Sequence, residues 1–74
     1  MEIAIAVNRL SALAHPTRLD IFRLLVKAGP QGMAAGELAS RTESLANTLS
    51  NNLTILSTAG LIASRREGRS IIYA

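Results

Sequence analysis

Cysteine is absent from the 74 residues of this chain, and histidine occurs only once, at position 15. Without thiols, neither a disulfide framework nor a thiolate metal site can form, so the composition leaves the redox compartment open. His15 alone cannot supply the three or four ligands that a zinc ion requires, and we interpret it as a turn or capping residue. The sequence therefore predicts neither a metal site nor a cofactor.

Aromatic residues are scarce as well, at 3% of the chain, although hydrophobic residues make up 49%. The core must therefore be built from leucine, isoleucine, valine and alanine, which suit packed helices better than a β-sandwich. A chain of this length forms one domain, residues 1–74, and buries only about 60% of the surface that its unfolded form exposes. The sequence thus predicts a small, mainly helical domain. Its modest core is compatible with further stabilisation by a second subunit.

Charged residues are missing from the run between Ser44 and Ser64, which is long enough in principle to cross a bilayer. The run is rich in asparagine, serine and threonine, and so many polar groups exclude a membrane-spanning segment. Residues 1–9 have no basic cluster, and their apolar stretch is too short for a signal peptide, so the sequence favours the cytoplasm.

Catalytic constellations are missing too. No serine or histidine is arranged as a nucleophile and its base, and the five carboxylates are scattered without a repeated spacing. The chain is therefore predicted not to be an enzyme. Its net charge of +3 and isoelectric point near 10.7 are compatible with binding to a polyanion without requiring it.

Helical periodicity is present in four segments, and β-branched runs flank a turn near the C-terminal end. The first residues alternate with period two and fit a strand or a helix, and we predict a helix there. Pro16 suits the first position of a second helix, which Gly29 and Pro30 end. We expect helices over residues 1–14, 16–28, about 34–41 and 45–59, a loop at 31–32, and a β-hairpin over 61–74 that turns at 67–68. This order of elements is that of a winged helix-turn-helix domain.

The fourth predicted helix has the clearest apolar stripe, because Leu45, Leu49, Leu53 and Leu56 follow one another at spacings of four, four and three residues. We expect all four leucines to face the core, and residues 42–44 to offer side chains that cap the helix. The opposite face is then polar and uncharged. It carries Asn47, Asn51, Thr54 and Thr58, flanked by Ser50 and Ser57.

Such a face lowers helix propensity without helping the domain to fold, since exposed helices usually carry lysine and glutamate. Contact with DNA explains why asparagine, serine and threonine occupy this exposed helix face. Asparagine can pair with an adenine edge in the major groove, while serine and threonine can bind a base or a phosphate. The alternative interpretation is an ordinary polar surface of poor helix propensity.

Three arginines, Arg65, Arg66 and Arg69, lie around the predicted hairpin turn. Guanidinium groups bind phosphates well, so the hairpin could straddle a DNA backbone or enter a minor groove beside the helix. The alternative is that these charges only keep the edge of a two-stranded ribbon soluble. The helix and the hairpin together favour DNA.

Across nearly its whole length the chain resembles the ArsR family of winged helix repressors. Four segments carry the resemblance in the expected order: LSALAHPTRLDIFRLL at 10–25, GELA at 36–39, TLSNNL at 48–53 and AGLIASRREGR at 59–69. The resemblance implies a homodimer that binds an inverted-repeat operator and leaves it when an inducer arrives. By position it implies DNA contacts at Thr48, Ser50, Asn51, Asn52, Arg65, Arg66 and Arg69, whereas Asn47 and Thr54 are proposed from the helix geometry alone.

The chain also departs from the family pattern. Metal-sensing members often carry Cys-x-Cys before the Glu-Leu of the third helix, and Ala34 and Gly36 stand there instead. Members commonly carry an aromatic or basic residue followed by histidine where Asn51 and Asn52 stand, so the operator cannot be transferred from relatives. The family's last helix would follow Ala74, which implies a fragment or a minimal member.

We therefore hypothesise a sequence-specific DNA-binding regulator, a homodimeric repressor released by an inducer. Its helix at 45–59 would enter the major groove, and residues 1–14 would supply much of the dimer contact. A rival hypothesis is a winged helix that binds a protein partner and no DNA. The low charge of the helix at 45–59 supports this rival. A third is a sensor of a metalloid or another small molecule, whose identity is not readable here and whose switch would lie beyond Ala74.

Overall fold

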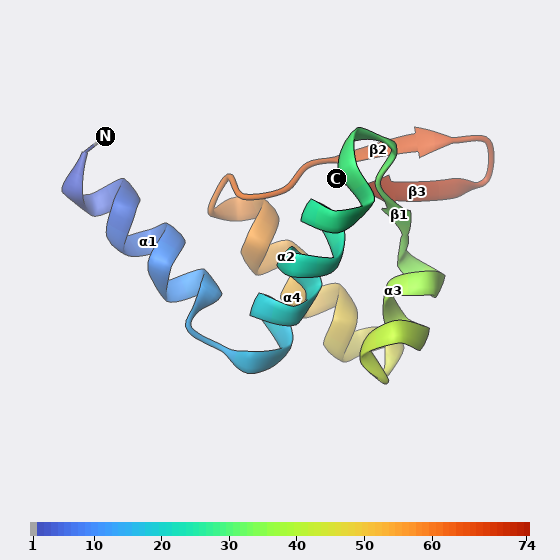
Figure 1. The fold of residues 1–74 in the computed structure, drawn as a ribbon, viewed down its shortest axis with the longest axis horizontal. Helices are drawn as coiled ribbons and strands as arrows, with labels where there is room; N and C mark the ends of the chain where they lie inside the picture. Colours follow the sequence, from blue (N-terminus) through green and yellow to red (C-terminus); the bar gives the residue numbers. More distant parts are fainter. Residues whose placement is uncertain (1) are drawn as a thin grey trace.

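The computed structural model describes residues 2–74, in which four α-helices stand beside a small three-stranded antiparallel sheet (Figure 1). This agrees with the mainly helical winged helix-turn-helix fold that the sequence predicts. The elements in chain order are α1 (Ile3–Leu13), α2 (Pro16–Ala28), the 3-10 turn η1 (Gly29–Gln31), β1 (Met33–Ala34), α3 (Ala35–Thr42), α4 (Ala46–Thr58), β2 (Ser64–Glu67) and β3 (Ser70–Tyr73).

The helix boundaries follow the proline and glycine signals closely. The alternating residues at the start of the chain are helical from Ile3, so the strand alternative is wrong. Pro16 is the first residue of α2, and Gly29 ends that helix with a φ of 75°, its N–H donating to the Leu25 carbonyl. Lys27 lies in the last turn of α2, where a cation is favoured by the helix dipole.

The start of α4 differs from the prediction. Leu45 is its N-cap residue, and no side chain caps the helix. The Thr42 hydroxyl instead donates to the Leu38 carbonyl at 2.7 Å and lies 2.8 Å from the Ser44 hydroxyl, so both polar side chains serve the end of α3 and the turn. The expected capping role of residues 42–44 is therefore wrong.

The core lies where the four helices meet, and three of the four predicted stripe leucines, Leu49, Leu53 and Leu56, are buried in it. Each such side chain contributes about 1.5–3 kcal/mol to stability by leaving water. Leu45 is 74% exposed, because its extended backbone (φ −67°, ψ 149°) places it before the helix and off its inward face. The other buried apolar residues are Ala12, Ile21, Leu25, Leu38 and Ile62.

The sheet has one strand more than the predicted hairpin. β1 pairs with β3 through Met33 opposite Tyr73 and Ala34 opposite Ile72, giving the strand order β1-β3-β2. Two residues are too few for a period-two pattern, so no sequence signal indicates this strand. The hairpin turns at Gly68 and the residue after it, one position later than predicted, with Gly68 at φ 61°.

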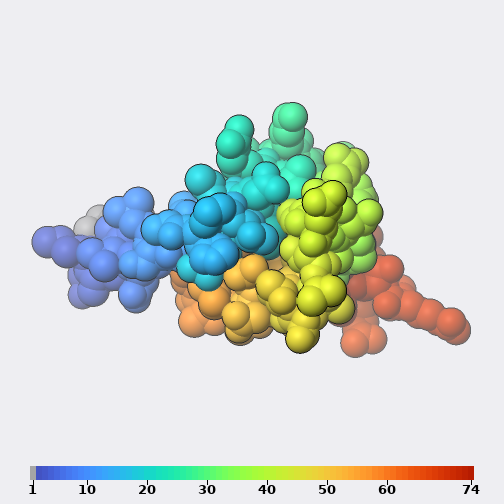
Figure 2. Space-filling model, turned by 90° about the horizontal axis from the view of Figure 1, so that it is seen from below, coloured from blue at the N-terminus to red at the C-terminus, as the bar shows by residue number. Residues whose placement is uncertain are grey.

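The molecule is elongated, with principal extents of 37 × 22 × 20 Å. Figure 2 shows α1 extending beyond the rest at one end and the β2–β3 hairpin, which we call the wing, at the other. The outer part of α1 exposes apolar side chains, including Ile3 at 80% and Leu10 at 68%. Within residues 2–74, none of the helices combines the length and the apolar character that a membrane span requires.

Candidate nucleic-acid interface

The outward face of α4 is polar and carries no charge. Helix geometry places side chains at 47, 51, 54 and 58 on one side, opposite the buried leucines, and all four are exposed. Thr48, Ser50 and Ser57 are exposed beside them. The structure therefore brings together the α4 residues that the helix geometry selected.

These side chains differ in how many hydrogen-bond donors and acceptors remain available to an outside partner. The Thr54 hydroxyl donates to the Ser50 carbonyl at 3.0 Å, one turn earlier in α4, and keeps its lone pairs for a donor from outside. The Asn47 side-chain oxygen accepts from the Thr48 N–H at 2.9 Å. The Asn51 amide makes no hydrogen bond with any other residue of 2–74, so its donor and its acceptor are both available.

Asn52 lies on the other side of the helix, and the predicted DNA contact there is wrong. Its residue is only 4% exposed, and its side-chain oxygen accepts a hydrogen bond from Arg18 Nη1 at 3.4 Å. Asn52 follows Leu49 by three positions and precedes Leu56 by four, which puts it on the inward side of α4. An inward side chain cannot reach a base edge. The spacing from the stripe leucines indicates this inward side, whereas the family resemblance implied an exposed contact.

Arg18 is the residue that the sequence reasoning missed. It belongs to the HPTR segment that carries part of the resemblance. Besides its contact with Asn52, its Nε donates to the Ala12 carbonyl at 2.7 Å. The signal available in the sequence was weak, because a single arginine near the start of a helix is most often a solvated surface residue.

The three wing arginines divide into two kinds. Arg65 is held by the protein itself: Nε donates to a Glu67 carboxylate oxygen at 2.6 Å, and its two terminal nitrogens donate to the carbonyls of Pro30 and Gln31 at 3.1 and 2.8 Å. These bonds fasten the wing to η1. Arg66 and Arg69 are exposed and form no hydrogen bond or ion pair with other residues of 2–74. The wing thus offers two free cations rather than three.

The wing and α4 lie along the same side of the molecule. Figure 2 shows α4, in yellow and orange, and the wing, in red, at one edge of the view, with α2 at the opposite edge. Tyr73 of β3 lines a shallow pocket together with Ala46 and Ser50 of α4. Arg66 pairs with Ile71, two residues before Tyr73, so it projects from the same face of the sheet as Tyr73.

No group of three histidine, cysteine, aspartate or glutamate residues within 2–74 is placed to hold a metal ion. On one side of the molecule the surface presents an uncharged polar helix, and the wing on that side carries two guanidinium groups that are unpaired within residues 2–74. Short polar side chains allow a helix to approach base edges closely, and the guanidinium groups suit phosphates. This combination is suited to duplex DNA.

Comparison with known proteins agrees with this geometry. Residues 13–65 match the family described as a helix-turn-helix domain. A relative from Mycobacterium tuberculosis, named an uncharacterized HTH-type transcriptional regulator, is 41% identical over 63 residues, which cover 84% of this chain and 53% of the relative. Other relatives are named a biofilm growth-associated repressor, from Agrobacterium fabrum, and the transcriptional activator HlyU, from Vibrio cholerae, each 36% identical.

Solved structures show the same architecture. HlyU from Vibrio cholerae superposes with a TM-score of 0.88 at 36% identity, covering 100% of this chain and 79% of HlyU. A winged helix-turn-helix domain from Mycobacterium bovis, described as homodimeric and as a possible ArsR-family transcriptional regulator, has a TM-score of 0.87 at 32% identity and covers 96% of this chain and 63% of that one.

The chain spans a little over half the length of several of its relatives, 53% in the Mycobacterium tuberculosis protein. The matched segment includes the whole helix-turn-helix unit and the first residues of the wing. The chain therefore belongs to the family of winged helix-turn-helix transcriptional regulators of the ArsR type.

Proposed function

We propose that this chain is a sequence-specific DNA-binding regulator of transcription, in which α4 enters the major groove and the wing binds the flanking backbone. The observation that carries the proposal is that α4, with its uncharged outward face, and the wing, whose strands and turn hold Arg66 and Arg69, lie along the same side of the molecule (Figure 2). A major groove about 12 Å wide admits one α-helix, and short side chains on that helix permit direct contact with base edges.

In this proposal the polar residues have separate tasks. The free amide of Asn51 pairs with an adenine through its donor and acceptor together. The remaining α4 contacts, near the start and middle of the helix, bind base edges or phosphates. They are made by Asn47, Thr48, Ser50 and Thr54. Arg66 and Arg69 bind phosphates without reading sequence. Arg65 and Asn52 position the surface and do not touch DNA.

We further propose that the working form is a homodimer joined through α1. Ile3, Val7 and Leu10 follow one another at spacings of four and three residues, lie on one side of α1 and are 53–80% exposed. An apolar row of this kind is stabilised by burial against a second copy. A two-fold dimer presents two copies of α4 and therefore fits an inverted-repeat operator. Binding to chromosomal DNA implies a cytoplasmic location.

We infer repression, because a dimer seated on an operator blocks the DNA it covers. The ArsR resemblance implies release by an inducer, a small molecule or a metalloid. This chain has no cysteine with which to hold a metalloid in the manner of the Cys-x-Cys members. These 74 residues therefore do not themselves bind a metalloid through thiolates.

The test is a gel-retardation assay with random-sequence duplex at low salt, followed by selection of the tightest-binding sequences. We expect retardation of random duplex and enrichment of an inverted repeat. The specific rival is a winged helix that binds a protein, favoured by the absence of charge on α4. No retardation at low salt would support that rival and overturn the DNA proposal.

A further inference from the structure

Two arginines tie α1 to its neighbours across the molecule. Arg9, on α1, donates from Nε to the carbonyl of Ala59 at the end of α4, at 3.3 Å. Arg18, on α2, donates from Nε to the carbonyl of Ala12 on α1 at 2.7 Å and from Nη1 to the Asn52 side-chain oxygen on α4 at 3.4 Å. Each guanidinium therefore bridges two or more helices.

The two backbone carbonyls that accept these bonds, those of Ala12 and Ala59, lie at the C-terminal ends of α1 and α4. The last carbonyls of a helix lack an intrahelical partner, and a positive charge is favoured beside them. Ala12 lies in the last turn of α1 and Ala59 is the C-cap of α4, and neither helix has a basic residue in its last turn. The partners for these ends thus come from other helices, so satisfying them also fixes how the helices are arranged.

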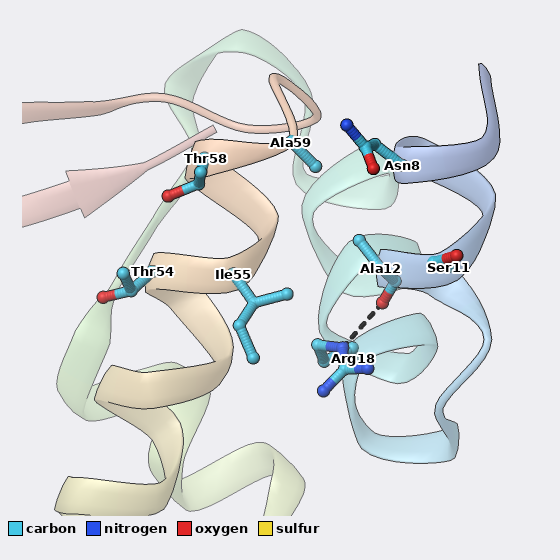
Figure 3. A pocket seen from close by; sticks show the side chains of 8 residues that line it. All are labelled: Asn8, Ser11, Ala12, Arg18, Thr54, Ile55, Thr58 and Ala59. Carbon is cyan, nitrogen blue, oxygen red and sulfur yellow. Dashed lines mark hydrogen bonds between the residues drawn. The ribbon is translucent and has the colours of Figure 1, made fainter. Parts of the chain in front are cut away.

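The interface between α1 and α4 is incompletely filled. A groove of about 440 Å³ runs between the two helices (Figure 3), lined by Asn8, Ser11, Ala12, Arg18, Thr54, Ile55, Thr58 and Ala59. Only small side chains come from α1 to this groove, and Ala12 is the one buried residue of α1. Few large apolar side chains interlock here, so the arginine bonds have more influence on the angle between the helices than they would in a filled interface.

We propose that Arg9 and Arg18, together with Asn52, are positioning residues that set the angle between α1 and α4 and thereby the distance between the two recognition helices of the dimer. The inference rests on the proposed function, in which α1 joins the subunits and α4 reads DNA. The two ties meet α4 at residues 52 and 59, about 10 Å apart along the helix, so together they resist rotation as well as separation.

Small changes of this angle matter for DNA recognition. A tilt of about 10° displaces the far end of an 11-residue helix by about 3 Å, which is close to the rise of one base pair. The two subunits double the displacement. A dimer with a fixed α1–α4 angle therefore selects one half-site spacing, whereas a dimer with a loose angle accepts several.

The first test measures spacing preference on the operator selected with the wild-type chain. Duplexes with the two half-sites moved by one or two base pairs are bound at fixed salt to the wild type, Arg9→Met, Arg18→Met, Asn52→Leu and Asn52→Asp. We expect the affinity of the wild type for one spacing to exceed its affinity for the others by about tenfold or more. Arg9→Met, Arg18→Met and Asn52→Leu should bind all spacings with affinities within about threefold of one another. Asn52→Asp keeps an acceptor for Arg18 and should keep the preference.

Arg23→Met is the matched control, because Arg23 is an exposed arginine on the same helix as Arg18 and makes no hydrogen bond or ion pair with other residues of 2–74. It should keep the wild-type preference. If the variants weaken every spacing by the same factor and retain the preference, the arginines only stabilise the fold and the inference is wrong. If the wild type itself retards no duplex, the proposed function fails instead.

The second test needs no DNA. Since the chain has no native cysteine, Ala4→Cys on α1 and Ser57→Cys on α4 provide the only sites for spin labels. Labelled protein diluted with unlabelled protein reports the distance within one subunit. We expect a narrow distribution in the wild-type and Arg23→Met backgrounds and a broader one with Arg18→Met or Asn52→Leu. Equal widths in all four would overturn the inference.

Discussion

At the scale of single residues, neighbouring asparagines on α4 have opposite surroundings. Asn51 is exposed with a free amide, and Asn52 is 4% exposed and bonded to Arg18. Each step along a helix turns the side chain by about 100°, which is enough to move it from the outward to the inward side. The same residue type can therefore serve DNA recognition at one position and helix placement at the next.

Asn51→Ala should relax sequence specificity. Losing a paired contact to adenine removes about 1–3 kcal/mol of discrimination against the wrong base. The measurement compares dissociation constants for the selected operator and for operators substituted at one base pair of each half-site. Ser40→Ala, at an exposed site on α3, should leave the ratios unchanged. Retention of full discrimination by Asn51→Ala would exclude Asn51 as a base contact.

The wing arginines should differ in how much each contributes to the salt dependence of DNA binding. Arg66→Ala or Arg69→Ala removes one phosphate contact from each subunit and should make the slope of log K against log salt shallower by about 1.8 in a dimer. Arg65→Ala should change the slope less but lower the midpoint of thermal unfolding, because it breaks the bonds to η1. Equal slopes for all three variants would contradict this division.

Residue composition and helix geometry sufficed to predict the exposed polar face of α4, since a stripe of leucines fixes the opposite side. They did not predict the state of Arg65, whose partners Pro30 and Gln31 are more than thirty residues away in sequence. Long-range partners of a flexible charged side chain depend on the tertiary arrangement. The importance of Arg18 was hidden for the same reason.

At the scale of elements, the junction between η1 and β1 depends on one glycine. Gly32 has a φ of 67°, and a Cβ at this position would overlap the carbonyl oxygen of Tyr73 on β3. The chain can therefore approach β3 and form the third strand only with glycine here.

Gly32→Ala should destabilise the domain by more than about 1 kcal/mol, because the substitution adds a clash to an unfavourable backbone conformation. Gly36→Ala is the matched control: Gly36 lies in α3 with open space around it and should gain up to about 1 kcal/mol from better helix propensity. Denaturant unfolding followed by circular dichroism measures both. Equal stability of the two variants would contradict this assignment.

The elements with strong local signals were predictable from the sequence. Pro16 and Gly29 bound α2 within one residue of the expected positions, because proline and glycine restrict or permit backbone conformations locally. β1 and the exposure of Leu45 were not predictable in the same way. The two-residue strand exists only through its pairing with β3, and the extended backbone at Leu45 removes it from the helical stripe.

At the scale of the whole molecule, the surface presents an apolar row at one end and a basic wing at the other. The row on α1 leaves Leu10 68% exposed and Val7 53% exposed. In the proposed dimer this end joins the subunits, while α4 and the wing remain free for DNA.

Leu10→Glu should convert the dimer to a monomer, because a charge buried without a partner in the subunit contact is strongly unfavourable. Sedimentation equilibrium measures the change, and affinity for the inverted repeat should fall with it. Lys27→Glu is a control at an exposed site on α2 and should remain dimeric. A dimeric Leu10→Glu would place the subunit contact elsewhere.

The salt dependence of wild-type binding to the selected operator bears most directly on whether α4 and the wing form a DNA-binding surface. Arg66 and Arg69 of two subunits supply four phosphate contacts, so log K should fall with log salt with a slope of about −3.6 or steeper. A slope near zero would mean that the guanidinium groups release no counterions from DNA and would contradict the proposed binding mode.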